Sequence, residues 1–320
     1  MKISKLHLFL DELVRPSFRI LRRQNPTVSS RSNHRLNASP TLKMSTTTTI
    51  NSITASNVTS LFPGVSTRLV GAAPSSNATN GDLTDDLAGY DAEQIRLMDE
   101  VCIVLDTSDN PIGSASKKAC HLMSNINAGL LHRAFSVFLF DPASKKLLLQ
   151  QRAAEKITFP NMWTNTCCSH PLAHPAEAGT GDLVSNVEGA KRAAQRKLGH
   201  ELGIKAEQVP VEAFEFLTRI HYLAPSDGKW GEHEIDYILF IEAQVDVEVN
   251  ENEVQATRWV DAAELRQMFK DVESASGKDK ALKYTPWFRL ICEGMLFEWW
   301  AALEKGQLGR YVGEKDIRKM

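Results

Sequence analysis

The chain has 320 residues, of which 42% are hydrophobic and 24% are charged, and its formal net charge is −2. This composition is typical of a soluble globular protein with one large or two modest domains. The near-neutral charge argues against a general nucleic-acid binder, which needs a strong basic excess. No stretch approaches the roughly 18 to 20 uninterrupted apolar residues that span a bilayer. The five cysteines form no disulfide framework and favour a reducing compartment.

The first 90 residues differ in composition from the rest of the chain. Residues 41–80 are rich in Ser, Thr and Asn and poor in apolar side chains, so we expect them to be disordered. The arginine-rich segment before them is similar to a mitochondrial transit peptide, although Asp11 and Glu12 weaken that interpretation. Alternatively, Met44 is the physiological start. We therefore expect a cytoplasmic protein, with a mitochondrial location as the alternative.

From residue 91 onward, apolar blocks alternate with turn signals, which predicts one mixed α and β domain over 91–305 and a tail over 306–320. The patterns predict, in chain order, a strand at 101–106, a hairpin-like pair of strands at 134–140 and 147–152, a helix at 187–202 that Gly203 ends, strands at 214–222, 234–243 and 257–260, a helix that Asp261 caps and that runs to 269, and a helix at 286–303.

The segment Asn165-Thr-Cys-Cys-Ser-His-Pro171 is polar where a hydrophobic strand would be expected. In extended chain, positions i and i+2 point the same way, so Cys168 and His170 share one face and Cys167 has the other. This arrangement favours chemistry at Cys168 and packing at Cys167. The alternative is that both cysteines are small buried hydrophobes and the histidine is structural.

A second group, Gly231-Glu-His-Glu-Ile-Asp236, opens an apolar strand. The same period of two places Glu232 and Glu234 on one face, which favours metal binding or a shared proton. Solvated acids at a strand end are the alternative.

Further histidines and cations precede these two groups. His121 and His132, together with His170 and the two glutamates, make a nitrogen and oxygen donor set suited to Mg²⁺, Mn²⁺ or Zn²⁺. Lys117, Arg152 and Lys156 have the chemistry to hold a phosphate-type group. Each histidine can equally be structural, and each cation can equally face solvent.

In combination, these groups resemble the type I isopentenyl-diphosphate delta-isomerases, a family of the Nudix-fold superfamily. The resemblance extends from about Leu97 to Trp300. The segments that carry it are Lys117-Lys-Ala-Cys-His121, Leu131-His-Arg-Ala-Phe-Ser136, Gln151-Arg152, Asn165-Thr-Cys-Cys-Ser-His-Pro171, Arg219-Ile-His-Tyr222, Trp230-Gly-Glu-His-Glu-Ile-Asp236 and Thr285-Pro-Trp287. It implies an α+β protein, a Nudix-like α/β/α sandwich with a mixed sheet behind the disordered leader.

The resemblance also implies a role for each site residue. The catalytic residues would be Cys168 and Glu234, assisted by Tyr222. The ligands of one divalent metal, Mg²⁺, Mn²⁺ or Zn²⁺, would be His121, His132, His170, Glu232 and Glu234. The diphosphate contacts would be Lys117, Arg152, Lys156 and Ser169. Glu201 would associate with a second ion, the Mg²⁺ that accompanies the diphosphate.

The implied reaction interconverts isopentenyl diphosphate and dimethylallyl diphosphate through a carbocation, in isoprenoid and sterol-precursor biosynthesis. We expect Glu234 with Tyr222 to protonate and Cys168 to accept a proton, with the direction left open. The thiol would need neighbouring positive charge to bring its pKa into the working range. Trp287 is the first choice for an aromatic wall that stabilises the cation, before Trp163 and Phe135. The expected partners are these two small molecules alone, without nucleic acid or membrane, and the expected state is a monomer.

One departure from the parent superfamily bears on the reaction. The helix motif that chelates metal in Nudix hydrolases has carboxylates at the positions where this chain has Lys197 and His200. The departure disfavours diphosphate hydrolysis. A Nudix hydrolase and a catalytically silent Nudix-like binding module remain the alternatives.

Overall fold

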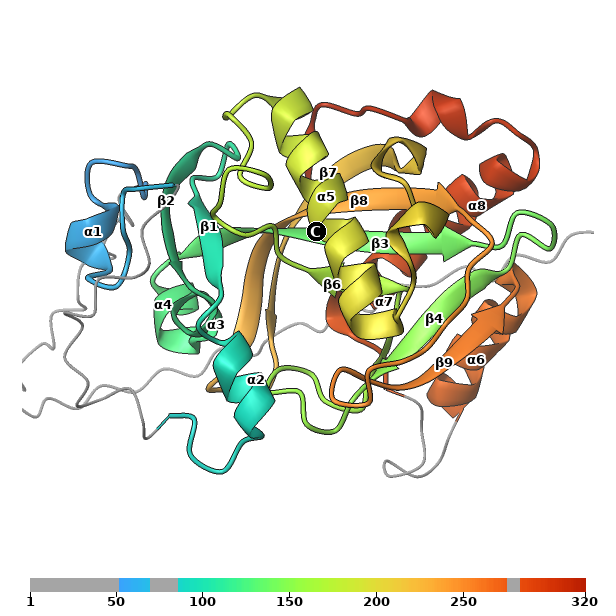
Figure 1. Ribbon diagram of the computed structural model, residues 1–320, viewed down its shortest axis with the longest axis horizontal. Coiled ribbons are helices and arrows are strands. Elements are labelled where there is room, and N and C mark those ends of the chain that lie inside the picture. The colour runs from blue at the N-terminus through green and yellow to red at the C-terminus, as the bar shows by residue number, and fades with distance from the viewer. Residues whose placement is uncertain (1–51, 70–85, 275–282) are drawn as a thin grey trace, which may run out of the picture. The chain divides into compact units, whose positions relative to one another are not determined.

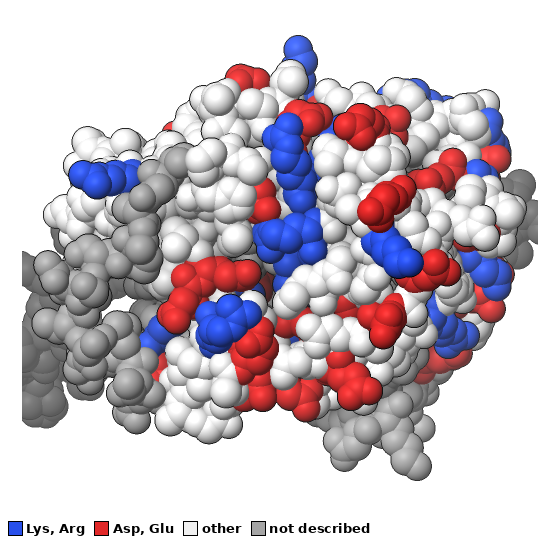
Figure 2. All heavy atoms as spheres, viewed as in Figure 1, with Lys and Arg blue, Asp and Glu red and all other residues white. Residues whose placement is uncertain are grey.

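The computed structural model describes residues 52–69, 86–274 and 283–320. The expectations for the arginine-rich leader, and for disorder at 41–51 and 70–80, lie outside these described residues. None of the helices in the described ranges combines the length and the apolar character that a bilayer crossing requires. On the face shown in Figure 2, acidic and basic side chains of the described residues are interspersed and do not separate into two large fields.

A mixed sheet forms the centre of the fold (Figure 1). Its main path runs in the order β10-β7-β8-β3-β1-β2, while β4 pairs with β3, β5 and β9, and β6 pairs with β3. The strands are β1 (Val101–Leu105), β2 (Pro111–Ser116), β3 (Leu131–Phe140), β4 (Leu147–Arg152), β5 (Trp163–Thr164), β6 (Cys167–Ser169), β7 (Glu215–Pro225), β8 (Gly231–Glu242), β9 (Val254–Val260) and β10 (Ile317–Lys319). The strands β3 and β8 are parallel to each other, and β7 and β8 are antiparallel.

Helices and short helical turns cover both faces of this sheet. They are α1 (Val58–Leu61), α2 (Ala92–Leu97), α3 (Lys117–His121), α4 (Met123–Asn127), α5 (Leu183–Leu202), α6 (Ala262–Ser274), α7 (Pro286–Ile291) and α8 (Phe297–Glu304), with 3₁₀ turns at Ala206–Gln208, Val211–Ala213 and Leu308–Tyr311 and a π-helical turn at Cys292–Leu296.

The long helix α5 begins and ends at the residues its sequence favours. The Asp182 carboxylate caps its first turn by accepting from the Ser185 backbone amide. Gly203 follows its last turn with φ +64°, a left-handed conformation that a side chain disfavours. A stripe of small and apolar residues, including Ala190, Ala194 and Leu198, is buried against the sheet. The predicted helix and its end at Gly203 are therefore confirmed.

The central strands present different chemistry on their two faces. On β3 and β8, the odd-numbered side chains, such as Val137 and Leu239, pack with α5 in one apolar core. The even-numbered residues Phe138 and Phe240 pack under α7 and α8 in a second core. These two cores confirm the α/β/α sandwich with a mixed sheet. Toward the start of both strands, the even-numbered positions become polar, and the candidate site lies there.

Residues 52–69, which the sequence predicted to be disordered, are ordered and packed. Val58, Phe62 and Val65 are buried with Cys102 and other apolar side chains of β1 and β2. The backbone of residue 66 also exchanges two hydrogen bonds with residue 114 of β2, at 2.8 and 2.7 Å. A few well-spaced apolar residues suffice here because they cover a sheet edge that already exists.

Two other expectations need correction. The segment predicted as a tail adds β10 to the sheet, parallel to β7. The predicted hairpin of β3 and β4 pairs only at Phe140 and Leu147, because β4 turns away to pair with β9. Both differences depend on contacts between distant segments, which local patterns do not contain.

Candidate active site

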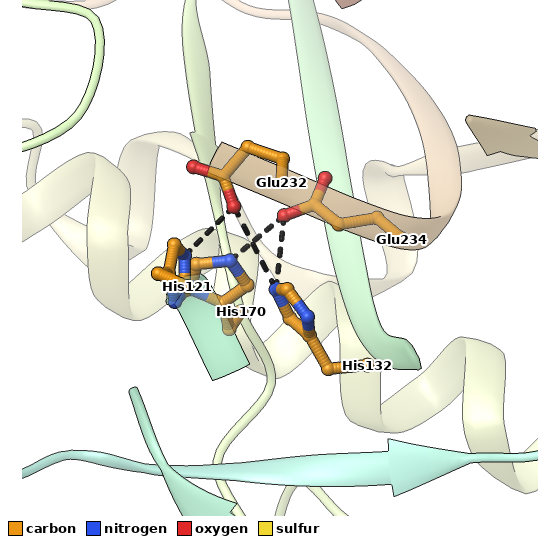
Figure 3. A group of neighbouring side chains, drawn as sticks. All are labelled: His121, His132, His170, Glu232 and Glu234. Carbon is orange, nitrogen blue, oxygen red and sulfur yellow. Dashed lines mark hydrogen bonds and ion pairs between the residues drawn. The ribbon is translucent and has the colours of Figure 1, made fainter. Parts of the chain in front are cut away.

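Five polar side chains from four parts of the chain meet at the polar end of the central strands. His121 ends α3, His132 lies on β3, His170 follows β6, and Glu232 and Glu234 lie on β8. One ligand atom from each residue lies within 4.8 Å of the others, and all five residues are buried (Figure 3). The period of two predicted for β8 is confirmed, because His233 points away and contacts His221 and the Leu130 carbonyl instead.

The cluster has the features of a metal centre. His121 Nε2 lies 2.7 Å from Glu232 Oε2, yet neither atom has a well-aligned hydrogen-bond partner among the described residues. The other ring nitrogen of His121 lies 2.6 Å from the Lys117 carbonyl oxygen, the kind of contact that orients a metal-binding imidazole. Burial, followed by the charges of His132 and His121, holds the pKa of His170 well below its usual range, which keeps that ring neutral. Imidazoles and carboxylates that converge in this way fit a divalent cation.

Glu234 also contacts a phenol. Its Oε1 lies 2.9 Å from His170 Nε2 and 3.3 Å from His132 Nε2, and its Oε2 accepts a hydrogen bond from the Tyr222 hydroxyl. Burial raises the pKa of Glu234, but His132 and then Tyr222 outweigh it, so the pKa lies below its ordinary value. Burial and the charge of Glu234 raise the pKa of Tyr222 well above its ordinary value. The phenol therefore stays protonated and donates to the carboxylate.

Cys168 occupies the facing position that its sequence pattern predicts. It lies on β6 and lines the pocket with His170, whereas Cys167 is fully buried in the core against α5. Burial raises the pKa of the Cys168 thiol to about 12, although Arg152, whose Nη1 lies 3.8 Å from the sulfur, acts in the opposite direction. Burial is thus the larger of the two effects on this thiol, and Arg152 only partly offsets it.

The predicted cations converge on the same pocket. Lys117, Arg152 and Lys156 all line it, as does Ser169. Arg152 is held in place by hydrogen bonds from its guanidinium to the carbonyls of Phe159 and Thr158, at 3.1 and 2.9 Å. Burial lowers the pKa of Lys156 to about 8, although Glu253 opposes this shift.

Glu201 reaches the pocket from the last turn of α5. Its carboxylate lies 3.2 Å from Lys197 Nζ and accepts from Gln150 Nε2 at 3.0 Å. Burial raises the pKa of Glu201, but the charge of the neighbouring Lys197 lowers it by more, so the pKa lies below its ordinary value. Glu201 is thus available as an oxygen donor at neutral pH.

An aromatic side chain closes one wall of the pocket. Trp287 is 3% exposed, stacks edge-on against Phe159 at a centroid distance of 5.1 Å and donates from Nε1 to Asn165 Oδ1 at 3.2 Å. Trp287 itself is one of the lining residues of the pocket. Phe135 also lines it, whereas Trp163 is not among its lining residues.

The pocket therefore brings together the predicted site residues that come from separate segments. All of them line it except Trp163 and His132. His132 contacts Glu232 and Glu234 in the metal cluster. Gln94, Met98 and Lys197 also line the pocket. The sequence had not singled out the first two, and it had noted Lys197 only as a departure from the hydrolase motif. Lys197 precedes Glu201 by four positions, one helical turn, and this spacing was a usable signal.

Comparisons with known proteins indicate the family of this chain. A model of the NUDIX domain matches residues 130–284. The isopentenyl-diphosphate delta-isomerase of Aspergillus fumigatus is 63% identical over 277 residues, which are 84% of this chain and 96% of that protein. The isopentenyl-diphosphate delta-isomerase of Schizosaccharomyces pombe is 60% identical over 211 residues, which are 66% of this chain and 88% of that protein. Among solved structures, a Deinococcus radiodurans protein aligns with 62% of this chain and 100% of its own length, at 12% identity and a TM-score of 0.40.

Proposed function

This chain belongs to the family of isopentenyl-diphosphate delta-isomerases, and we propose that it interconverts isopentenyl diphosphate and dimethylallyl diphosphate. The identity to the Aspergillus fumigatus enzyme, 63% over 96% of that protein, supports the assignment. The observation that carries the chemistry is the pocket itself, in which the Cys168 thiol, the Glu234 carboxyl and a group of cations face the same space. Such an enzyme serves isoprenoid biosynthesis and supplies precursors of sterols.

The reaction moves a carbon-carbon double bond. A proton is added to the terminal carbon of the isopentenyl group, which leaves a tertiary carbocation, and a second proton is lost from the carbon nearer the diphosphate. We assign protonation to Glu234 with Tyr222, and proton removal to Cys168. In the reverse direction the two groups exchange roles, so each must carry and release a proton once per cycle.

The positions of these two groups support a shared substrate. Cys168 lies on β6 and Glu234 on β8, and both strands pair with β3, one on each side. A flat isopentenyl group that lies over β3 is then within reach of an acid on one side and a base on the other.

The metal cluster fits this chemistry. We propose that His121, His132, His170, Glu232 and Glu234 hold one divalent cation, Mg²⁺, Mn²⁺ or Zn²⁺, and that Glu201 associates with the Mg²⁺ of the diphosphate. When bound, these ions would strengthen the acidity of the Glu234 carboxyl and neutralise part of the diphosphate charge. The chain's own cations, Lys117, Arg152 and Lys156, would bind the phosphate oxygens with Ser169.

The aromatic wall would protect the carbocation. Trp287 offers the face of a large π system at the pocket wall, and a cation over such a face is stabilised by about 0.5–2 kcal/mol. The same buried ring excludes water, which would otherwise quench the carbocation.

Specific residues argue against the two alternative functions, a Nudix hydrolase and a silent binding module. A Nudix hydrolase needs clustered carboxylates on the helix, where Lys197 is buried at the pocket and His200 lies 3.0 Å from its ammonium group. A silent binding module has no need of a thiol and a metal cluster in one pocket. We further propose that the protein is a monomer in the cytoplasm, a compartment that keeps thiols such as those of its five free cysteines reduced.

Isotope uptake tests the proposal. Incubation with isopentenyl diphosphate in heavy water should give dimethylallyl diphosphate that carries deuterium on the newly formed methyl group, as detected by NMR or mass spectrometry. Release of pyrophosphate or of a monophosphate, without isomerised product, would identify a hydrolase instead. Binding without any chemical change would identify a silent module.

A further inference from the structure

Glu253 is a buried carboxylate behind the pocket that has no part in the reaction described above. It lies immediately before β9, and its side chain is 1% exposed. A charged group this deeply buried requires compensating partners. Its partners connect it to the binding of the substrate.

The two carboxylate oxygens of Glu253 are used differently. Oε2 lies 2.7 Å from Lys156 Nζ and 3.6 Å from Lys197 Nζ, so that one oxygen serves two ammonium groups. Oε1 accepts a hydrogen bond of 2.8 Å from Gln94 Nε2 of α2. Burial raises the pKa of Glu253, but Lys156 and then Lys197 lower it well below its ordinary value, so the group is a carboxylate at neutral pH.

These three partners line the pocket, whereas Glu253 itself does not. They come from separate elements, namely the loop after β4, helix α5 and helix α2. The Glu253 backbone is fixed as well, because its carbonyl accepts from the Ala153 amide at 3.0 Å and its amide donates to the Asn250 carbonyl at 2.9 Å. The Glu253 carboxylate is therefore held in a fixed position behind the longer side chains that line the pocket.

Both lysines need such a point if they are to bind an anion together. A lysine ammonium is a point charge on a flexible stem, and its own geometry does not fix its direction. Two ammonium groups buried side by side also repel each other unless a negative charge lies between them. Each ammonium has three donors. Lys156 uses one of them on Glu253, whereas Lys197 also lies 3.2 Å from Glu201 and 3.0 Å from His200, so the donors left for phosphate oxygens are mainly those of Lys156. Holding both groups in place before binding lowers the entropic cost of association.

We propose that Glu253 is a positioning residue that holds the ammonium groups of Lys156 and Lys197 at the pocket wall, where the pair receives the diphosphate of the substrate. This inference rests on the proposed function, because it presumes a diphosphate ligand. Glu253 acts through the lysines and does not touch the substrate.

The test compares Glu253→Gln with the wild-type protein. The variant keeps the shape and removes the charge, and we expect KM for isopentenyl diphosphate to rise at least tenfold while kcat stays within threefold. The dissociation constant of inorganic pyrophosphate, measured by calorimetry, should rise by a similar factor. Glu251→Gln is the matched control, because it makes the same charge change two positions away on an exposed side chain, and both constants should stay within twofold.

A double-mutant cycle shows whether Glu253 acts through the lysines. In a Lys156→Met background, Glu253→Gln should raise KM by a smaller factor than in the wild-type background. The proposal is overturned if Glu253→Gln raises KM by the same factor in both backgrounds. It is also overturned if folded Glu253→Gln protein has a KM and a pyrophosphate dissociation constant within twofold of wild type. A structural role alone would lower the melting temperature and leave KM unchanged.

Two further outcomes keep the result interpretable. If Glu253→Gln does not fold, Glu253→Asp is the variant to test. It keeps the negative charge on a side chain that is one methylene shorter, so the carboxylate lies farther from the lysines. A KM increase above threefold then supports the proposal, and a smaller change contradicts it. Failure of the proposed function is separate, because wild-type protein would then form no dimethylallyl diphosphate at all.

Discussion

Replacing Tyr222 by phenylalanine removes one hydroxyl from the pocket and keeps a ring that is 3% exposed. In the wild-type chain this hydroxyl donates to Glu234 Oε2. The histidines approach the other oxygen, Oε1. Among the described residues, the variant therefore leaves Oε2 without its donor.

The size of the effect follows from this single hydrogen bond. A hydrogen bond to a charged group contributes about 1.5–3 kcal/mol, and about 1.36 kcal/mol of barrier changes a rate tenfold. If the bond acts in the transition state, we expect kcat of Tyr222→Phe to fall by about 10- to 150-fold. KM should change by less than about threefold, because the hydroxyl is bonded to Glu234 and not to the cations that bind the diphosphate.

The assay is the initial rate of dimethylallyl diphosphate formation over a range of substrate concentrations. Tyr237→Phe is the matched control, because the Tyr237 hydroxyl also donates to a buried carboxylate, Asp109, but outside the pocket. That variant should lose stability and keep its kcat. The reasoning is refuted if Tyr222→Phe retains kcat within twofold of wild type, or if both variants lose kcat equally.

Three further predictions concern the thiol, the metal and a lysine. Cys168→Ala should reduce turnover by about 10²- to 10⁴-fold and end deuterium uptake from heavy water. The control is Cys292→Ala, which changes a buried cysteine of the C-terminal helix and should lower only the melting temperature. An active Cys168→Ala enzyme would contradict the role assigned to the thiol. Dialysis against a chelator should abolish activity, and a divalent ion should restore it; active protein that metal analysis finds free of divalent ions would contradict the cluster. The ratio kcat/KM should fall as pH rises above about 8, because the pKa of Lys156 is lowered to about 8 and its positive charge is lost above that value. Lys156→Arg stays charged and should remove this decline, so an unchanged decline in that variant would assign it to another group.

Sequence patterns predicted the parts of the fold that depend on near neighbours. The stop residue of α5, the alternation along β8 and the bounds of β4 each depend on a few adjacent side chains. The metal cluster was within reach for the same reason, since Glu232 and Glu234 share a face by local periodicity alone. Donor chemistry suggested their grouping with His121 and His132, and the resemblance to a family made that grouping specific.

The features that the sequence did not predict depend on distant contacts. The parallel pairing of β3 with β8 joins residues about a hundred positions apart, as at His132 and Glu234. Lys197 stands in the sequence where a hydrolase has a carboxylate, yet the fold makes it a cation of the pocket wall. Glu253 belongs to no sequence motif, and its proposed role follows only from its contacts with Lys156, Lys197 and Gln94. The high pKa of Cys168 likewise depends on its burial, which a sequence does not state.

The ordered segment at 52–69 has a practical consequence for fragments of this protein. A fragment that began at residue 91, where the composition changes, would lack Val58, Phe62 and Val65 and would expose the apolar surface around Cys102. It would also uncover the backbone of β2 that now bonds to residue 66, and an open strand edge invites association between chains. A fragment intended for crystals or assays should therefore start upstream of residue 52.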